Sequence, residues 1–244
     1  MATLAIGDIH GNLDALDDLL DQIGRAIGSD DSVVFLGDYI DRGPDAKGCV
    51  ERILRFRAET PVRVVCLCGN HEEWMLNTWS DFRRHSWLLG MEPLDTIRSY
   101  SPAAAEPLLA GIADAKVAIY LEKCALPYEL FFDAIPEEHR LFFHQLVDYH
   151  ETPDCVCVHA GLDTAVHALD EQTARDLRWG GDGFPEGYRG AKPVVYGHWN
   201  NALIEAGWPR PRIIGATIGI DTISHGVLTA VRLPDREVFQ SARY

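Results

Sequence analysis

The sequence predicts an α/β fold built on a mainly parallel sheet. Short apolar runs alternate with helical patterns from the N-terminus to about residue 73, in the order strand, helix, strand, helix, strand. Each apolar run ends beside a glycine in a cluster of polar residues. Because parallel strands bring their carboxyl ends to one edge of a sheet, these clusters are predicted to form one composite active site.

Composition limits the classes of protein to which this chain can belong. Its 244 residues suffice for one large domain and contain no linker-like stretch, so residues 1–244 are expected to form a single domain. Hydrophobic residues make up 47% of the chain, which allows a substantial core. The net charge of −15 argues against a nucleic-acid partner or an anionic membrane, because such binding depends on Lys and Arg.

The N-terminus and the cysteines both indicate a cytoplasmic protein. No basic region or cleavage site precedes the first motif, and no apolar run approaches the roughly 20 residues needed to span a bilayer. Two cysteine pairs have Cys-x-Cys spacing, Cys66/Cys68 and Cys155/Cys157, but Cys-x-x-Cys spacing is missing. The six cysteines are therefore expected to be reduced core residues, with a zinc site as the alternative.

The first predicted strand, residues 3–6, leads into Gly7-Asp8-Ile9-His10-Gly11-Asn12. Residues i and i+2 at a strand end point the same way, so Asp8 and His10 can share one cation. Asn12 is expected to cap a helix with one apolar and one acidic face. The apolar face repeats at helical spacing and consists of Leu13, Leu16, Leu19, Leu20 and Ile23.

The second strand, residues 33–36, leads into the motif Gly37-Asp38-Tyr39-Ile40-Asp41-Arg42-Gly43. A strand end carrying two carboxylates and an arginine can hold a metal ion, orient a catalytic acid or base, and bind an anion. Asp38 is predicted to lie at the centre of a two-metal site.

A helix over about residues 46–58 and a strand over 62–68 are expected next, and the strand ends in Asn70, His71 and Glu72. Asn70 is a neutral ligand that suits a site whose total charge must stay moderate. The neighbouring His71 can bind a metal ion or transfer a proton, and the pattern leaves both roles open.

Residues 74 to 150 carry the weakest pattern and are predicted to be an insert that forms a cap near the active site. Helices are expected there over about 103–111 and 136–150. Packing or surface roles are expected for its tryptophans and histidines, which are Trp74, Trp79, Trp87, His85, His139, His144 and His150.

The pattern of strands followed by ligands returns in the C-terminal part. Runs at 155–158 and 193–196 end in His159 and His198, in the same relation to their strands as Asp8 and Asp38. Residues 212–220 and 227–231 are expected to be closing strands of a second sheet, with His225 on the loop between them.

Five strands thus end in potential metal ligands, which are Asp8 with His10, Asp38, Asn70, His159 and His198. Carboxylate, imidazole and amide ligands without a thiolate suit manganese, iron or zinc better than calcium. A carboxylate able to bridge suits two ions about 3.5–4 Å apart, as in two-metal phosphoesterases.

The ordered motifs resemble those of the calcineurin-like metallophosphoesterases, and within them those of the bacterial serine/threonine protein phosphatases. The resemblance rests on Gly7-Asp8-Ile9-His10-Gly11, the 37–43 motif, Gly69-Asn70-His71-Glu72, His159-Ala160-Gly161 and Gly197-His198, and residues 221–229 resemble the closing segment. It implies a four-layer α/β/β/α sandwich of two mixed sheets flanked by helices. It also implies two divalent metal ions, for which manganese is the first expectation and iron or zinc the alternatives.

The resemblance implies which residues hold these ions. Asp8 and His10 would bind the first ion, and Asp38 would bridge the two. The second ion would be bound by Asn70, His159 and His198.

The resemblance further implies roles in binding and chemistry. His71 would protonate the leaving oxygen, oriented by Asp41. Arg42 would bind phosphate oxygens, with its guanidinium fixed by Glu72. Further phosphate contacts would come from Asn70, His225 and a second arginine, for which Arg178 is preferred over Arg189.

The implied activity is hydrolysis of phosphoserine, phosphothreonine and possible phosphotyrosine monoesters, by in-line attack of a hydroxide between the metal ions. The expected partner is a phosphorylated protein or a small phosphoester. A symmetrical dinucleoside tetraphosphate hydrolase shares the same motifs, but Asp41 favours the phosphatase because such hydrolases carry a non-acidic residue there. A regulatory protein without turnover is the remote alternative, and retention of every ligand and of His71 argues against it.

Overall fold

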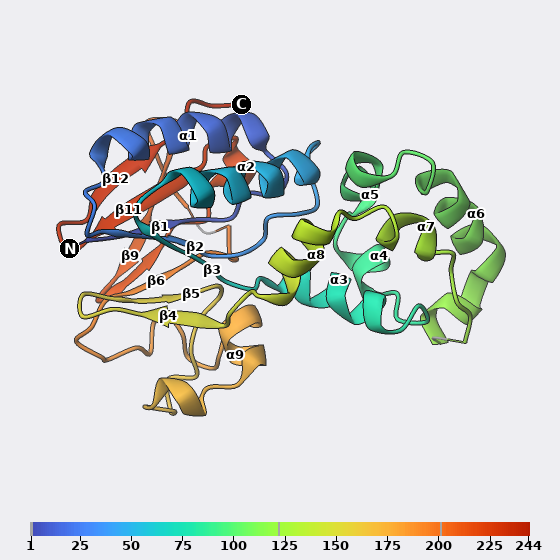
Figure 1. Ribbon diagram of the computed structural model, residues 1–244. Coiled ribbons are helices and arrows are strands. Elements are labelled where there is room, and N and C mark those ends of the chain that lie inside the picture. Colours follow the sequence, from blue (N-terminus) through green and yellow to red (C-terminus); the bar gives the residue numbers. More distant parts are fainter. Residues whose placement is uncertain (1, 122, 201) are drawn as a thin grey trace.

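The computed structural model describes residues 2–121, 123–200 and 202–244 and confirms the predicted four-layer fold. Two five-stranded mixed sheets pack against each other, and helices lie outside them (Figure 1). A lobe of helices projects from one side of the sheets. Both ends of the chain lie on the sheet side of the molecule.

The first sheet contains the N-terminal strands, in the order β12-β11-β1-β2-β3. Its three parallel strands are β1 (Thr3–Ile6), β2 (Ser32–Phe35) and β3 (Arg63–Cys66). Its antiparallel strands are β11 (Thr229–Leu233) and β12 (Glu237–Gln240). The connecting helices α1 (Leu13–Ala26) and α2 (Ala46–Glu59) cover its outer face, as Figure 1 shows.

Helix α1 forms because its apolar residues fall on one face, which is buried against the sheet. The prediction that Asn12 caps this helix is confirmed for its position but not for its side chain. Asn12 occupies the N-cap position, but its side chain makes no capping bond and donates instead to the carbonyls of Ile9 and His10. These bonds tie the turn after β1 to the start of the helix.

The second sheet has the order β4-β5-β6-β10-β9. Its strands are β4 (Tyr149–Glu151), β5 (Val156–Val158), β6 (Val194–Tyr196), β9 (Arg212–Ile214) and β10 (Thr217–Gly219). Strands β5, β6 and β10 are parallel, and the edge strands are antiparallel to them. The smaller elements nearby are η2 (Leu169–Glu171), α9 (Ala174–Trp179), the hairpin β7 (Leu203–Glu205) and β8 (Trp208–Arg210), and η3 (Ile223–His225).

Three buried apolar clusters among the described residues join the layers of the fold, and one of them packs Leu177 of α9 against β5 and β6. Residues between the two sheets form one buried cluster, which includes Val34 of β2 and Val195 of β6. A second cluster joins α1 and α2 to the outer face of the first sheet and continues into the helical lobe. All six cysteines are free, and the Sγ atoms of Cys155 and Cys157 lie 3.9 Å apart between the sheets.

The C-terminal strands differ from the expectation. Residues 212–220 form two strands, β9 and β10, that pair with each other. The last predicted strand, around residues 227–231, does not close the second sheet, because β11 pairs with β1 in the first. The chain therefore crosses from one sheet to the other after β10.

Residues 74 to 150 form most of the helical lobe, seen on the right of Figure 1. Its elements are α3 (Asn70–Ser80), α4 (Ser86–Gly90), α5 (Leu94–Tyr100), α6 (Ala105–Ala115), η1 (Lys116–Leu121), α7 (Glu129–Phe132) and α8 (Glu137–His144). The helix predicted to reach residue 150 ends at His144, since the chain then becomes extended and pairs with β5.

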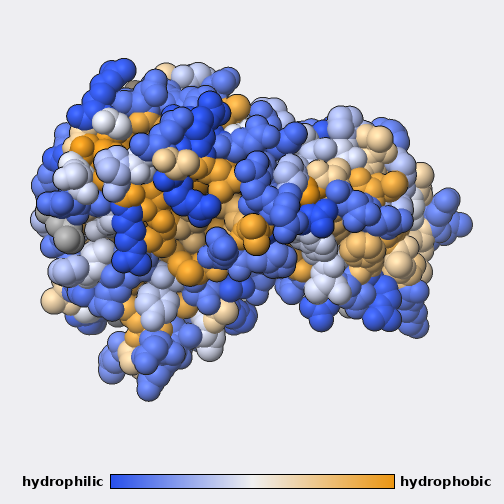
Figure 2. Space-filling model, in the orientation of Figure 1, coloured by the Kyte–Doolittle hydropathy of each residue, from blue (hydrophilic) through white to orange (hydrophobic). Residues whose placement is uncertain are grey.

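The tryptophans and histidines of the lobe mostly pack, as expected. Trp87 is fully buried, Trp79 stacks on Phe132, and the buried His85 and His139 contact tyrosine hydroxyls. Figure 2 shows hydrophobic residues gathered over the sheets and over the helical lobe, within a largely hydrophilic surface. No helix among the described residues has the length and apolar character required to cross a membrane.

Candidate active site

Six parallel strands bring polar residues to one region between the sheets. Residues Asp8, Asp38 and Asn70 follow the strands of the first sheet, β1, β2 and β3. The second sheet contributes the residues that follow β5, β6 and β10, which are His159, His198 and Asp221. Asp221 was not among the sequence-predicted ligands.

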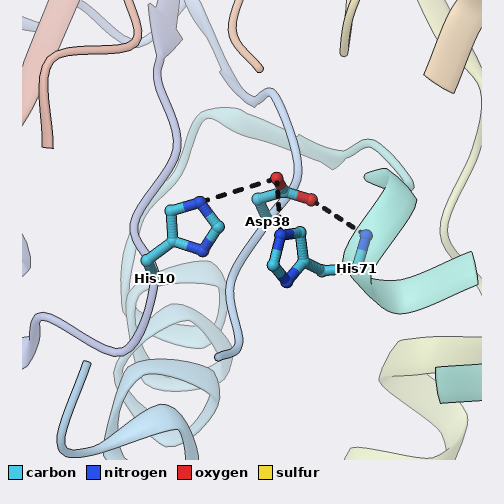
Figure 3. Close-up of side chains that lie close together, drawn as sticks. All are labelled: His10, Asp38 and His71. Carbon is cyan, nitrogen blue, oxygen red and sulfur yellow. Dashed lines mark hydrogen bonds and ion pairs between the residues drawn. The ribbon is translucent and has the colours of Figure 1, made fainter. Parts of the chain in front are cut away.

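Asp38 lies at the centre of this site, and its two carboxylate oxygens face different histidines. Its Oδ2 atom lies 3.6 Å from His10 Nε2 and 3.9 Å from His71 Nε2, as Figure 3 shows. Its Oδ1 atom lies 3.5 Å from His159 Nε2. Two groups of residues with potential ligand atoms within 4.8 Å of one another share this carboxylate, His10-Asp38-His71 and Asp38-His159-His198.

The turn that carries Asp38 has an unusual backbone. Asp38, Asp41 and Arg42 have φ angles of 51°, 70° and 66°, in the left-handed region that non-glycine residues rarely occupy. The buried Glu72 carboxylate holds this turn, because it accepts bonds from the N–H groups of Asp38, Tyr39 and Gly69 at 2.9, 2.9 and 3.0 Å. Strained backbone held by surrounding structure is common at functional sites.

The expected contact between Glu72 and Arg42 is therefore wrong. The Glu72 oxygens are taken up by backbone N–H groups, and its burial raises its pKa to about 8. The exposed Arg42 instead donates from Nη1 to His10 Nε2 at 2.9 Å.

Backbone carbonyls set the tautomers of two histidines. His10 Nδ1 lies 2.9 Å from the Ile40 carbonyl, and His159 Nδ1 lies 2.9 Å from the Leu36 carbonyl. Each Nδ1 therefore donates, which leaves the Nε2 lone pair on the side of Asp38. The lone pair of His10 Nε2 accepts from Arg42 Nη1, so a metal ion bound there would take the place of this bond. Burial lowers the pKa of His10 to about 3 and also lowers that of His159, so both rings are neutral ligands.

Asn70 joins the two histidines of the second sheet. Its Oδ1 lies 3.0 Å from His159 Nε2 and 3.0 Å from His198 Nδ1, while its Nδ2 points at the Met91 sulfur. Since His159 donates through its other nitrogen, its Nε2 and the Asn70 oxygen are two acceptors that face each other. A cation between them would turn this unfavourable contact into coordination.

Asp8 supplies the clearest sign that the site fits cations. Its Oδ1 is buried and has no hydrogen-bond partner among the described residues, whereas its Oδ2 accepts the N–H of His198 at 2.8 Å. Burial raises the pKa of Asp8, and the negative charges of Asp221 and Asp38 raise it further. A buried cluster of three carboxylates needs a positive charge to be stable in its ionised form.

Asp221 is the site residue that sequence reasoning missed. It is 2% exposed, and its Oδ2 accepts the N–H of Asn200 at 2.6 Å. Burial raises its pKa to about 6. The signal is present in Gly219-Ile220-Asp221, where Asp221 follows a short strand as Asp38 does, but the apolar residues at 212–220 mask the break between β9 and β10.

His71 and Asp41 form a buried pair beside the metal ligands. His71 Nδ1 donates to Asp41 Oδ2 at 2.7 Å, so its Nε2, which has no partner among the described residues, points at Asp38. Burial alone would lower the pKa of His71, but Asp38 and Asp41 raise it above its usual value. This ring is thus suited to hold a proton at Nε2.

The insert contributes directly to that pair. Trp87 Nε1 donates to Asp41 Oδ2 at 2.9 Å, and the Thr96 hydroxyl donates to Oδ1 at 2.9 Å. The Thr96 oxygen also accepts the N–H of Asp41 at 2.7 Å. Burial raises the pKa of Asp41, and these bonds together with His71 oppose the increase.

The remaining predicted phosphate contacts lie farther out. Arg178 of α9 pairs with Asp148 at 2.6 Å and with Glu73 at 3.4 Å, and it acts electrostatically on His159. Arg189 is exposed and donates to backbone carbonyls of its own loop. His225 is half-buried in η3, and no contact brings its ring to Asp38 among the described residues.

Known proteins share parts of the sequence of this chain and its fold. Residues 1–201 match the model of a family described as calcineurin-like phosphoesterase. A zinc-dependent endopolyphosphatase of Saccharomyces cerevisiae is 37% identical over 67 residues, covering 28% of this chain and 19% of that protein. A symmetrical bis(5'-nucleosyl)-tetraphosphatase of Pseudomonas putida is 31% identical over 125 residues, covering 50% of this chain and 39% of that protein. The match spans less than half the length of both relatives.

Longer similarities come with lower identity. An asymmetrical bis(5'-nucleosyl)-tetraphosphatase of Oceanobacillus iheyensis is 24% identical over 95% of this chain and 88% of its own. Among solved structures, a proposed diadenosine tetraphosphatase superposes with a TM-score of 0.63 at 20% identity, covering 100% of this chain and 94% of that one. The protein-tyrosine phosphatase of a Shewanella species gives 0.57 at 16% identity, covering 99% and 80%. These structures share the fold with this chain.

Proposed function

Because the chain belongs to the calcineurin-like phosphoesterase family, we propose that it is a phosphoprotein phosphatase that works with two divalent metal ions. Its main substrates would be phosphate monoesters of serine and threonine, with those of tyrosine as an additional class. The observation that carries this proposal is Asp38, whose Oδ2 faces His10 and whose Oδ1 faces His159. A carboxylate shared between two histidine groups is suited to bridge a pair of ions.

The proposed ligands follow from this arrangement. Asp8 and His10 would hold one ion. The other ion would be held by Asn70, His159 and His198, and Asp38 would bind both. Manganese is the proposed metal, since a set of carboxylate, imidazole and amide ligands accepts it readily. Bound there, two such ions would act as Lewis acids that lower the pKa of water and neutralise the charge of the phosphate.

The protein's own residues would position the substrate and move a proton. The exposed Arg42 and the buried Asn70 would both bind phosphate oxygens. Arg178 and His225 are proposed as further phosphate contacts, which requires Arg178 to leave its partner Asp148. His71 would give the proton at Nε2 to the leaving oxygen, since Asp41 holds its Nδ1 and supports the protonated ring.

A second candidate is the hydrolysis of dinucleoside tetraphosphates. It is favoured by two relatives that carry this activity in their names, one of which matches 95% of the chain. Asp41 favours the phosphatase, because it anchors His71 as an acid for an alkoxide leaving group, and the phosphate leaving group of a polyphosphate needs such help less. The reduced cysteines further lead us to propose a cytoplasmic location.

One panel of substrates tests the proposal. The protein is loaded with Mn²⁺, and kcat/KM is measured for phosphoserine, phosphothreonine and phosphotyrosine peptides, diadenosine tetraphosphate and an aryl phosphate. A higher kcat/KM for a phosphopeptide than for diadenosine tetraphosphate supports the phosphatase. The reverse order replaces it with the second candidate, and no turnover of any substrate contradicts both.

A further inference from the structure

A pocket beside the metal site has no role in the mechanism above. It has a volume of about 390 Å³ and is lined by Glu73, Trp74, Arg175 and Trp179, which we call the aromatic pocket. Its walls come from α3 and α9, the helix next to the start of α3 in Figure 1. We propose that the aromatic pocket binds a planar aromatic ring carried by the substrate.

Ring contacts connect this pocket to the active site. The Trp74 and Trp179 rings lie 4.7 Å apart between centroids, and Trp179 lies 6.2 Å from the ring of His198. Trp74 is on the same helix as Asn70 and His71, about one turn farther along. A substrate with its phosphate at Asp38 therefore has the pocket within reach of the group attached to that phosphate.

The two indole rings are fixed before any substrate arrives. Trp179 Nε1 donates to Glu73 Oε2 at 2.6 Å, which sets the orientation of its ring. The backbone of Gly90 lies at the edge of the Trp74 ring, where an added Cβ would come within 3.0 Å of Cζ3. Rigid aromatic walls favour ligands that stack or meet edge to face, and they lose little entropy on binding.

Packing alone does not account for this pair. Trp87, in the same lobe, is fully buried, whereas Trp74 and Trp179 are half-buried and border an open cavity. Ligand pockets typically combine such apolar walls with a few polar groups.

The charged groups around the pocket suit a phosphate-bearing ligand. Glu73 is paired with Arg178 and with the Trp179 N–H, so its charge is compensated. Arg175 is exposed and forms no ion pair among the residues that the structure describes. It can therefore meet a negative charge on the substrate, in a protein whose net charge is −15.

The inference rests on the proposed function, and the experiment separates the two. Wild-type protein with Mn²⁺ is compared on phosphotyrosine and phosphoserine peptides of one sequence, on diadenosine tetraphosphate and on glycerol phosphate. Trp74→Leu removes the ring, Trp74→Phe retains one, and Trp208→Leu changes a tryptophan that packs under Arg243 instead. Binding of adenosine and of N-acetyltyrosine amide is measured in parallel by equilibrium dialysis.

We expect Trp74→Leu to raise KM for a ring-bearing substrate about tenfold more than for glycerol phosphate, with most of the loss rescued in Trp74→Phe. In equilibrium dialysis, Trp74→Leu should also bind adenosine or N-acetyltyrosine amide more weakly, whichever carries the same ring as the affected substrate. Trp208→Leu should show neither effect. The substrate that responds, nucleotide or phosphotyrosine, identifies the source of the ring. Equal KM changes for all substrates overturn the inference and leave the proposed function standing, whereas a wild-type protein without turnover overturns the proposed function.

Discussion

Trp87 donates a hydrogen bond of 2.9 Å to Asp41 Oδ2, the same oxygen that accepts the bond from His71. Trp87 belongs to α4 of the insert, and Asp41 to the turn after β2. The insert is thus part of the framework that fixes the proposed catalytic acid, whether or not it also caps the site. Its removal would leave Asp41 buried with two fewer donors.

The bonds from Trp87 and Thr96 lead to the first prediction. Trp87→Phe removes one donor to the buried Asp41 carboxylate, and Thr96→Val removes one donor together with the acceptor of the Asp41 N–H. Both retain most of the packing, so we expect kcat on an alkyl phosphate to fall about tenfold or more. The fall should be smaller with 4-nitrophenyl phosphate, whose leaving group needs no proton. Thr78→Val is the control, because Thr78 is equally buried but donates to the Arg84 carbonyl. Equal losses on both substrates would contradict a positioning role.

The second prediction concerns His71 itself. His71→Asn should reduce kcat on a phosphoserine peptide by about 10²- to 10⁴-fold, because the leaving oxygen loses its proton donor. The metal content, measured by atomic emission, should stay at the wild-type value. A variant that keeps its metal ions and its kcat on this substrate, which has a poor leaving group, would refute the role of His71 as an acid. A variant that loses metal would instead assign His71 as a ligand, since it lies in one group of potential ligands with His10 and Asp38.

Asp38→Asn tests the bridging carboxylate. The substitution removes the charge shared by both histidine groups, so the protein should lose metal from both positions and activity with it. Metal stoichiometry is measured at equal free Mn²⁺ in variant and wild type. Two tightly bound ions and normal turnover in the variant would disprove the assignment.

Asp221→Asn tests the site residue that was not among the predicted ligands. Asp221 is buried near Asp8 and adds negative charge to the site, so its neutralisation should weaken metal binding about 10- to 100-fold, as for residues that support metal ligands. Calorimetric titration with Mn²⁺ measures the change. Asp235→Asn is the control, because that carboxylate pairs with Arg232 away from the site. Equal affinities of Asp221→Asn and the wild type would exclude an electrostatic role.

His139 predicts how stability depends on pH. Its ring is buried, its Nδ1 contacts the Tyr100 hydroxyl, and burial lowers its pKa. Below about pH 6.5 the unfolded chain takes up a proton on this residue, whereas the folded chain keeps it neutral. The contribution of His139 to the free energy of unfolding is therefore complete above that pH and is lost as the pH falls. The loss amounts to at most about 1.4 kcal/mol per pH unit.

Urea unfolding of the metal-free protein at pH 7.5 and 5.5 measures this slope. His139→Gln should show a smaller loss of stability between the two pH values than the wild type. His144→Gln, which changes an exposed histidine on the same helix, should retain the wild-type slope. A slope that His139→Gln does not alter would show that other groups cause the acid sensitivity.

Much of the fold was predictable because its signals are local. Glycine and a polar residue directly after an apolar run mark the end of each strand, and the order of the motifs identifies the family fold. Asp8, His10, Asp38, Asn70, His159 and His198 could be proposed as ligands on this basis. Each belongs to a short motif that can be recognised without knowing which residues surround it in the folded protein.

Only the tertiary structure decided the contacts between distant segments. It gave Glu72 to the backbone of the 38–39 turn rather than to Arg42, and it placed β11 in the first sheet and Asp221 beside Asp8. It also brought Trp87 and Thr96 to Asp41, and Trp179 to Trp74. Such pairs carry no shared spacing in the sequence, because sheet order, burial and helix packing determine which side chains meet. The sequence thus determined which candidate metal ligands follow the strands, because those signals are local. The packing of the insert and α9 determined what contacts the His71–Asp41 pair and what lines the aromatic pocket.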